Sequence, residues 1–215
     1  LRPARDDFMM GPILARVLRV GTPIALNTAA YALVYWGLLR WTISPLGPEI
    51  NASLGIGFSA LEGFTWPVFH GVSLAVASLI GRYLGAGQVE SAKEVAKLAV
   101  PLSTVLGLAA ASIFYWGARP LCSVFTADPV VLDAAILYAQ VLAFSQVFVA
   151  WEALTEGVLA GAGDTRTVLF WSAPVNVIRI PLGYVLAFSL GWGAAGVWWA
   201  INLTTLVKAL TKGTA

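Results

Sequence analysis

The chain has 215 residues, of which 59% are apolar and 11% are charged, and its mean hydropathy is +0.80. Soluble domains carry about 25% charged residues, so this sequence has too few to cover a water-facing surface. The composition indicates a protein surrounded by lipid rather than the buried core of a larger soluble complex. Basic residues spread along the chain argue against nucleic-acid binding. One cysteine, Cys122, excludes an internal disulfide and a multi-cysteine metal site.

Six apolar stretches are each long enough to cross a bilayer as a helix, which takes about 20 residues. The stretches are continuous, whereas the strands of a membrane barrel alternate over about 10 residues. The predicted fold class is therefore all-α: a polytopic membrane protein whose residues 1–215 form a single six-helix transmembrane bundle. The predicted spans are 14–40, 53–83, 92–117, 130–160, 167–190 and 194–211.

Local signals mark the ends of these predicted helices. The segment 91–94, Ser-Ala-Lys-Glu, has the pattern of a capping box and predicts the start of the third helix. Asp128 followed by Pro129 predicts the start of the fourth helix, and Asp164 predicts the start of the fifth. Two Gly-Ala-Gly sequences, at 85–87 and 161–163, predict the ends of the second and fourth helices.

Basic residues are distributed unevenly between the two sides of the predicted bundle. Ten fall in or beside the odd-numbered loops and two beside the even-numbered loops. Because cytoplasmic loops carry an excess of Lys and Arg, we expect both termini to be cytoplasmic, with tryptophans near the opposite interface. The ten are Arg2, Arg5, Arg16, Arg19, Arg82, Lys93, Lys97, Arg166, Lys208 and Lys212; the two are Arg40 and Arg119; the tryptophans are Trp41, Trp116 and Trp192.

Five ionisable residues fall inside predicted spans, where such residues are rare and usually face a cavity or the bundle interior. They are Glu62, His70, Glu152, Glu156 and Arg179. Glu152 and Glu156 are four residues apart and share one helix face. Two carboxylates this close in a low dielectric require a proton or a metal cation between them, unless Arg179 or Arg166 neutralises them as a structural pair. Glu156 lies nearer the predicted cytoplasmic end, so we favour Glu152 as the functional acid.

The second predicted helix carries Glu62, then Trp66 one turn later, then Pro67. An acid, an aromatic face and a proline bend are parts of a cation-binding cavity. The alternative is a kinked helix whose carboxyl is hydrogen-bonded or wetted near the interface. His70 follows in the same helix and could take part in transport, although a lone histidine is more often a neutral hydrogen-bonding partner. The sequence clusters too few ligands near His70 for a metal site.

Arg179 lies mid-span between Pro174 and Pro181, with Asn176 one turn before it. A buried guanidinium needs a partner, and we expect a structural ion pair with one of the two glutamates of the fourth span. Broken helices also offer carbonyls and helix ends to substrates at membrane depth. No nucleophile elbow, HExxH motif or nucleotide loop is present, so nothing in the sequence indicates an enzyme.

Several short motifs are similar in order and spacing to those of multidrug and toxic compound extrusion (MATE) transporters. One resembles the loop after the second helix of a half in this family, and another resembles the loop after the fourth. Three more resemble the fifth and sixth helices. These motifs are, in order, Gly81–Gly87 with Glu90–Ala92, Gly157–Arg166, Asn176, Ile180–Tyr184 and Gly191–Trp198.

The resemblance implies one half of a transporter with twelve helices in two six-helix halves around a central cavity. Such transporters exchange sodium ions or protons for organic cations by alternating access. The motif Gly21-Thr22-Pro23 and the absence of an acid over 14–41 favour the C-terminal half. Some members carry a glutamate in the first helix of that half, which this chain lacks. Glu152 and Glu156 lie in the helix where the family places acids of the C-terminal half.

We therefore hypothesise that the chain is one half of a cation-coupled multidrug efflux antiporter. We expect it to lie in a cell membrane, namely a bacterial inner membrane. Its expected partners are a small organic cation, the lipid bilayer and a second six-helix half. That second half would come from the same chain upstream or from another copy. The only expected cofactor is H⁺ or Na⁺ as the coupling ion. Because the chain begins at Leu1, we expect a fragment or a processed product. Protonation or sodium binding at Glu152, assisted by Glu62 or Glu156, would switch the facing of the cavity.

Two alternatives remain open at this stage. A lipid-linked oligosaccharide flippase of the same superfamily would need a basic cavity for the pyrophosphate, and only Arg179 is positioned for one. A non-transporting scaffold subunit would have Glu62, Glu152 and Arg179 all paired and no cavity.

Overall fold

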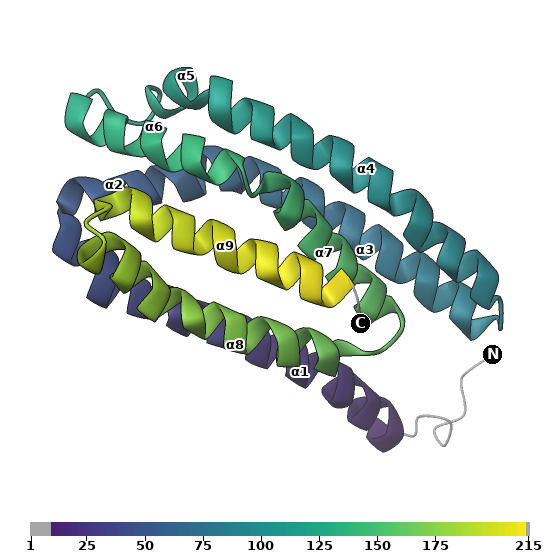
Figure 1. Ribbon diagram of the computed structural model, residues 1–215. Helices are drawn as coiled ribbons and strands as arrows, with labels where there is room; N and C mark the ends of the chain where they lie inside the picture. The colour runs from purple at the N-terminus through teal and green to yellow at the C-terminus, as the bar shows by residue number, and fades with distance from the viewer. Residues whose placement is uncertain (1–9, 214–215) are drawn as a thin grey trace.

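The computed structural model describes residues 10–213, and every regular element in that range is helical (Figure 1). The all-α prediction is therefore confirmed. The helices are α1 (Met10–Leu38), α2 (Pro48–Ile56), α3 (Gly63–Gly85), α4 (Val89–Trp116), α5 (Ala118–Cys122), α6 (Pro129–Ala143), α7 (Gln146–Gly161), α8 (Thr165–Tyr184) and α9 (Gly193–Gly213). Three π-helical segments, η1 (Leu39–Ile43), η3 (Gly57–Glu62) and η4 (Val185–Ser189), and a 3₁₀ turn, η2 (Ser44–Leu46), extend them.

Within the described residues, four helical segments are long and apolar enough to cross a membrane: Val17–Leu46, Pro48–Gly85, Val89–Trp116 and Thr165–Ser189. Helices α6 and α7 make a fifth if the pair, bent by 58°, counts as one span. The sixth predicted stretch is helical as α9 but does not meet these limits. It carries Asn202, Thr204, Thr205 and Lys208, all of them buried. That α9 crosses the membrane as the sixth span therefore stays a prediction.

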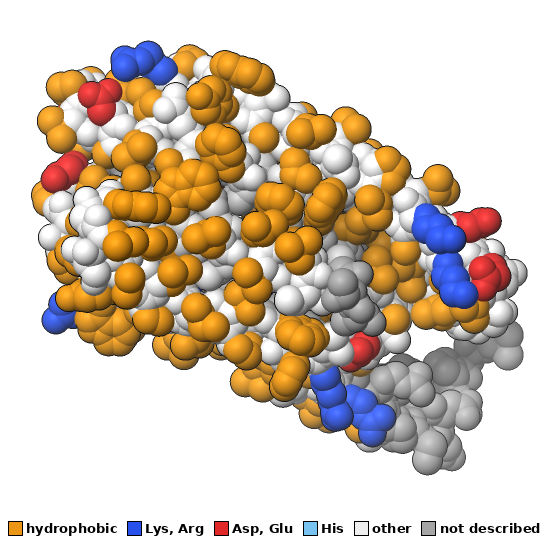
Figure 2. Space-filling model, in the orientation of Figure 1, with side chains coloured by type: hydrophobic (Ala, Val, Ile, Leu, Met, Phe, Trp, Pro, Cys, Tyr) orange, Lys and Arg blue, Asp and Glu red, His pale blue; other side chains and the backbone are white. Residues whose placement is uncertain are grey.

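The two ends of the bundle differ in their side chains. The turns that contain the Gly-Ala-Gly sequences, α3–α4 and α7–α8, lie at one end, here called the GAG end. Trp41, Trp116 and Trp192 are exposed at the opposite end, here called the tryptophan end. Figure 2 shows hydrophobic side chains along the visible face, with charged side chains gathered towards both ends. This distribution is the one expected of a bundle that spans a hydrocarbon layer.

The basic residues of the predicted loops fall partly outside what the structure describes. Arg2 and Arg5 lie outside the described residues, and the side chains of Arg16 and Lys212 are likewise not among those described. Arg82, Lys93, Lys97 and Arg166 lie on the helical turns nearest the GAG end, and Arg40 and Arg119 lie towards the tryptophan end. Lys208, which the loop count assigned to the interface, is instead buried within α9.

The predicted helix starts are partly confirmed. The Asp128 carboxylate accepts hydrogen bonds from the backbone N–H groups of Val130 and Val131, and it caps α6 as expected. The Asp164 carboxylate caps α8, and hydrogen bonds from Thr167 lower the pKa of this exposed carboxyl. The capping box at 91–94 was wrong, because α4 already begins at Val89 after Gln88.

Helix α9 lies between α8 and the α6–α7 pair (Figure 1). Helix α9 packs against α6, α7 and α8, while α7 also packs against α3 and α4, and α8 against α1. The largest apolar core lies where α2, α6 and α9 meet, around Tyr138 and Trp198, both of which are fully buried. Because α9 lies against both α7 and α8, its polar side chains face the ionisable residues of these two helices.

Two glycines one turn apart allow α7 to approach α3 closely. A Cβ at Gly157 would lie 2.4 Å from the backbone oxygen of Ser73, and a Cβ at Gly161 would lie 2.6 Å from that of Ala77. This spacing, small residues four apart, is the usual device for close helix contact in membranes. In the sequence these glycines belong to a loop motif, and the close contact between α3 and α7 was not predicted.

We expect Gly157→Ala to lower the free energy of unfolding by about 1–3 kcal/mol, because the added methyl group forces the α3 backbone away. Thermal unfolding of the purified protein in detergent measures the change. Gly71→Ala is the matched control in α3, since a Cβ there meets nothing within 4 Å. Equal melting temperatures for the two variants would contradict the close contact.

The span formed by α6 and α7 bends although neither proline nor glycine occupies the break at Phe144–Ser145. Its freed carbonyls are satisfied by side chains. The Ser145 hydroxyl and the Gln146 amide both donate to the carbonyl of Leu142, at 3.0 and 3.3 Å. Asn202 of α9 donates to the Val141 carbonyl at 2.6 Å. The bend is therefore held in part by α9.

Candidate functional site

Arg179 is 2% exposed on α8, about 21 Å along the helix axis from its start at Thr165. Its Nε donates to the Thr204 hydroxyl at 3.0 Å, and its Nη2 donates to the Thr205 hydroxyl at 3.4 Å. Its Nη1 donates to the Tyr35 hydroxyl at 3.4 Å, and the guanidinium carbon lies 5.7 Å from the centre of that ring. The buried guanidinium is thus held by hydroxyl groups of α1 and α9.

The predicted ion pair between Arg179 and a glutamate of the fourth span is wrong. The hydrogen bonds of Arg179 go to hydroxyl groups, and Glu152 pairs instead with Lys208. The physical reason is the position of α9, which packs against both α7 and α8. Side chains from α8 and α7 therefore meet polar groups of α9, which a sequence without tertiary contacts does not reveal.

Glu62 is the last residue of η3 and accepts a hydrogen bond from the Tyr138 hydroxyl of α6. Gly57 makes this contact possible, because a Cβ at that position would overlap the Tyr138 ring. The ring also packs edge-on against Trp198, with centroids 4.8 Å apart. Pro67 lies inside α3, whereas the π-helical segment η3 ends at Glu62, so the predicted proline bend stays a prediction. The hydrogen-bonded carboxyl was one of the two alternatives for Glu62.

Tyr35 connects Arg179 and Glu62. The Tyr35 ring lies 4.7 Å from that of Tyr31 and 5.3 Å from that of Phe58 in η3. Arg179 and Glu62 both interact electrostatically with the two tyrosines and with each other. The residues that share these contacts are here called the tyrosine–arginine cluster: Tyr31, Tyr35, Glu62, Tyr138, Arg179, Thr204 and Thr205.

Glu152 of α7 and Lys208 of α9 form an ion pair, with 2.8 Å between Oε1 and Nζ. The side chains are 13% and 4% exposed. Glu152 lies about 14 Å along α7 from Gly161, which places the pair inside the bundle rather than at the GAG end. A buried charge of either sign is costly alone, so each residue stabilises the charged form of the other.

Glu156, His70 and Asn176 are the remaining predicted site residues. Glu156 is half-buried on α7, one turn nearer the GAG end than Glu152. His70 is exposed on α3, with its ring stacked on that of Trp66 at 6.0 Å. Asn176 is 2% exposed, one turn before Arg179, and no described residue hydrogen-bonds its Oδ1. Among the described residues no group of three or more His, Cys, Asp or Glu side chains is arranged to hold a metal.

A family model described as MatE matches residues 23–185, most of the chain. The chain belongs to the MatE family. The resemblance stated from the sequence motifs is therefore confirmed, and so is the helical membrane architecture that it implied.

Curated relatives of this chain carry multidrug resistance names. The "Probable multidrug resistance protein NorM" of Pseudomonas aeruginosa is 28% identical over 216 residues, which cover 94% of this chain and 44% of that protein. The protein of the same name from Thermotoga maritima is 28% identical over 91% of this chain. The "Multidrug resistance protein MdtK" of Pectobacterium atrosepticum is 28% identical over 92% of this chain and 43% of its own length. This chain thus spans less than half of these relatives.

Solved MatE structures have the same fold. A "MOP superfamily transporter from Pyrococcus furiosus" superposes with a TM-score of 0.86 at 25% identity, over 92% of this chain and 43% of that one. A "multidrug resistance MATE family transporter" in an outward-facing conformation gives the same score and identity over 92% of this chain and 44% of its own. The match over less than half of each transporter agrees with the predicted half.

Several residues of the candidate site were not predicted from the sequence. Lys208 was treated as a loop charge, although it lies four residues after Thr204 on a polar stripe of α9. Tyr31 and Tyr35 are also four residues apart and share one face of α1. Tyr138, in contrast, left no local signal, because its partner Glu62 lies 76 residues earlier in the chain.

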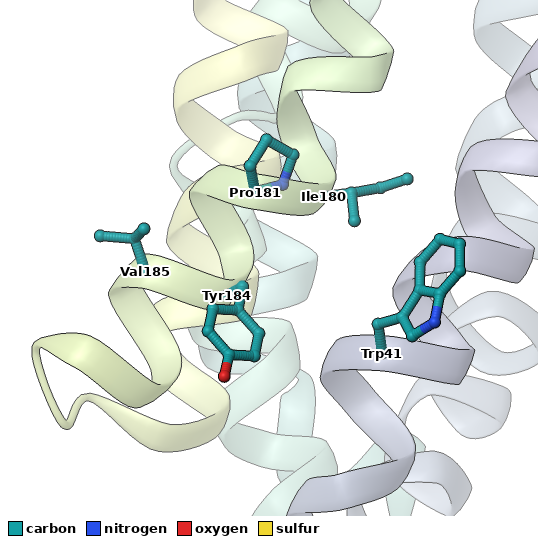
Figure 3. Close-up of a pocket in the computed structure, with 5 residues that line it drawn as sticks. All are labelled: Trp41, Ile180, Pro181, Tyr184 and Val185. Carbon is teal, nitrogen blue, oxygen red and sulfur yellow. The ribbon is translucent and has the colours of Figure 1, made fainter.

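A separate apolar groove of about 470 Å³ opens between η1 and the end of α8 with η4, near the tryptophan end (Figure 3). The residues that line it are Trp41, Ile180, Pro181, Tyr184 and Val185. None of Glu62, His70, Glu152, Glu156 and Arg179 lines this groove. The groove therefore does not coincide with the tyrosine–arginine cluster or with the Glu152–Lys208 pair.

Proposed function

We propose that this chain is the C-terminal six-helix half of a cation-coupled multidrug exporter. Its substrate is a small organic cation, and it works in a bacterial inner membrane with both termini in the cytoplasm and a second six-helix half as its partner. The multidrug resistance names of the MatE relatives support the substrate class. The match to less than half of each relative supports the half-transporter arrangement. The observation that carries the proposal is the buried carboxylate of Glu152 in a bundle of this family.

In this proposal Glu152 is the residue that exchanges cations. Its side chain is 13% exposed, so a small ion can reach it, and its carboxylate is already held against a positive charge on α9. Adding a proton or a sodium ion weakens the attraction between Glu152 and Lys208. Because α9 also packs against α6 and α8, a change in this attraction acts on the contacts of both helices. In this proposal, such a change alters the side of the membrane to which the central cavity of the transporter opens.

Glu62 has an assisting role in the proposal. The carboxyl lies in the tyrosine–arginine cluster, and Tyr31 of that cluster is 36% exposed. An aromatic face beside a carboxylate attracts organic cations. Trp66, 46% exposed one turn after Glu62, adds a second aromatic face.

The test is drug efflux from cells that express the complete transporter with Glu152→Gln. We expect efflux to fall at least about tenfold at every pH, because the amide neither accepts a proton in this range nor holds a sodium ion by charge. Glu90→Gln is the matched control, since Glu90 is 83% exposed and pairs with Lys93 at 2.8 Å on the surface. Unchanged efflux from the Glu152→Gln variant at every pH would reject the proposal.

The scaffold alternative agrees with one feature of the structure. Glu62, Glu152 and Arg179 all have partners, as a structural subunit requires. Family membership is what favours transport over this alternative, and the Glu152→Gln experiment separates the two. The flippase alternative ranks lower, because the second buried cation, Lys208, is already paired with Glu152.

A further inference from the structure

The chain contains two lysine–glutamate pairs of the same length in different surroundings. Lys93 and Glu90 are 2.8 Å apart on the surface of α4, with side chains 58% and 83% exposed. Lys208 and Glu152 are also 2.8 Å apart, but they join two different helices and are 4% and 13% exposed. Exposed pairs contribute little to stability, whereas a buried charge depends on its partner. The buried pair therefore calls for a specific explanation.

Lys208 supplies the Glu152 carboxylate with a positive charge that belongs to the protein. In a low dielectric, a carboxylate needs a cation nearby, and an ammonium at 2.8 Å meets this need. A second cation at the same carboxylate would be repelled by the first. The ammonium and an inorganic ion therefore compete for one position.

We propose that Lys208 is a tethered counter-cation that excludes sodium ions from Glu152. The inference rests on the proposed role of Glu152 as the cation-exchanging residue and specifies which cations it accepts. Sodium binds only when the ammonium has moved away, so this half operates without sodium at Glu152. The flexible four-carbon stem of lysine lets the ammonium leave and return without backbone movement.

Three other described residues bear on the charge at the pair. Glu156 follows one turn later on α7, and it adds negative charge to the site. Arg179 is engaged by Thr204 and Thr205, the hydroxyl residues that precede Lys208 on α9. Tyr35 interacts electrostatically with Glu152. Removal of the Lys208 charge therefore takes away the cation that lies 2.8 Å from the Glu152 carboxylate, which favours sodium binding there.

The test compares sodium binding by purified transporters that contain this chain, measured as the rise in melting temperature when sodium chloride replaces choline chloride at constant ionic strength. We expect the sodium-specific rise of Lys208→Arg, which keeps the positive charge, to equal that of the unmodified protein. Lys208→Met is expected to bind sodium at least about tenfold more tightly and to melt at a higher temperature in sodium. Lys93→Met is the matched control and should match the unmodified protein.

A second measurement keeps the proposal testable if Lys208→Met does not fold. Radioactive sodium binding to the unmodified protein and to Glu152→Gln should be equal, because Lys208 already occupies the carboxylate. Sodium binding that is present in the unmodified protein and lost in Glu152→Gln would overturn the proposal. So would equal sodium affinity of the unmodified protein and a folded Lys208→Met variant. Neither readout uses drug efflux, so failure of the exporter proposal is seen separately.

Discussion

Replacing Arg179 with methionine is expected to lower the free energy of unfolding by about 2–4 kcal/mol and to abolish transport. The guanidinium donates to hydroxyl groups of Tyr35, Thr204 and Thr205, and it ties α8 to α1 and α9. Methionine fills much of the volume but donates no hydrogen bond. The Thr204 hydroxyl keeps its own bonds to carbonyl groups of α9, which limits the loss. Thermal unfolding in detergent and drug efflux measure the two effects.

The control for this prediction is Arg119→Met. Arg119 lies 3.6 Å from Asp133, with side chains 70% and 74% exposed, so its pair contributes about 0–1 kcal/mol. We expect Arg119→Met to melt close to the temperature of the unmodified protein. We expect Arg179→Met to melt at a clearly lower temperature. Equal melting temperatures would mean that the tyrosine–arginine cluster does not hold the helices together.

The second large effect is expected at the Glu152–Lys208 pair. Removing one partner leaves the other charge buried, which costs about 3–5 kcal/mol. The double variant, Glu152→Gln with Lys208→Met, removes both charges and should cost less than the sum of the single changes. Unfolding of all four proteins gives the coupling energy, which we expect to be about 2–3 kcal/mol.

The same cycle at Glu90 and Lys93 provides the comparison, because that pair has the same 2.8 Å distance on an exposed surface. We expect its coupling energy to be below about 1 kcal/mol. Additive effects at Glu152 and Lys208 would be inconsistent with a buried pair in which each charge depends on the other.

The helical stretches could be predicted because their signal is local. A run of about 20 apolar residues is visible in the sequence wherever the chain later packs. The cap at Asp128 was predictable for the same reason, since its partners are the next two or three residues. The break between α6 and α7 was not, because no proline or glycine marks it and Asn202, far along the chain, helps to hold it.

The sequence predicted several members of the candidate site, among them Glu62, Glu152 and Arg179, but not which side chains they contact. Glu62, Glu152 and Arg179 stood out because charged residues are costly inside apolar runs. Their partners depend on which helices are neighbours, and α9 packs against both α7 and α8. Lys208 lies near the end of the chain, so counting charges by loop placed it at the interface, whereas the structure buries it.

Transport by the purified complete protein in liposomes tests most directly whether Glu152 exchanges a cation for a drug. A fluorescent organic cation is loaded on one side, and a proton or sodium gradient is imposed across the membrane. We predict that the gradient drives dye movement by the unmodified protein and by Glu90→Gln, and that Glu152→Gln loses this movement. Dye movement that proceeds equally well with the Glu152→Gln variant would contradict it.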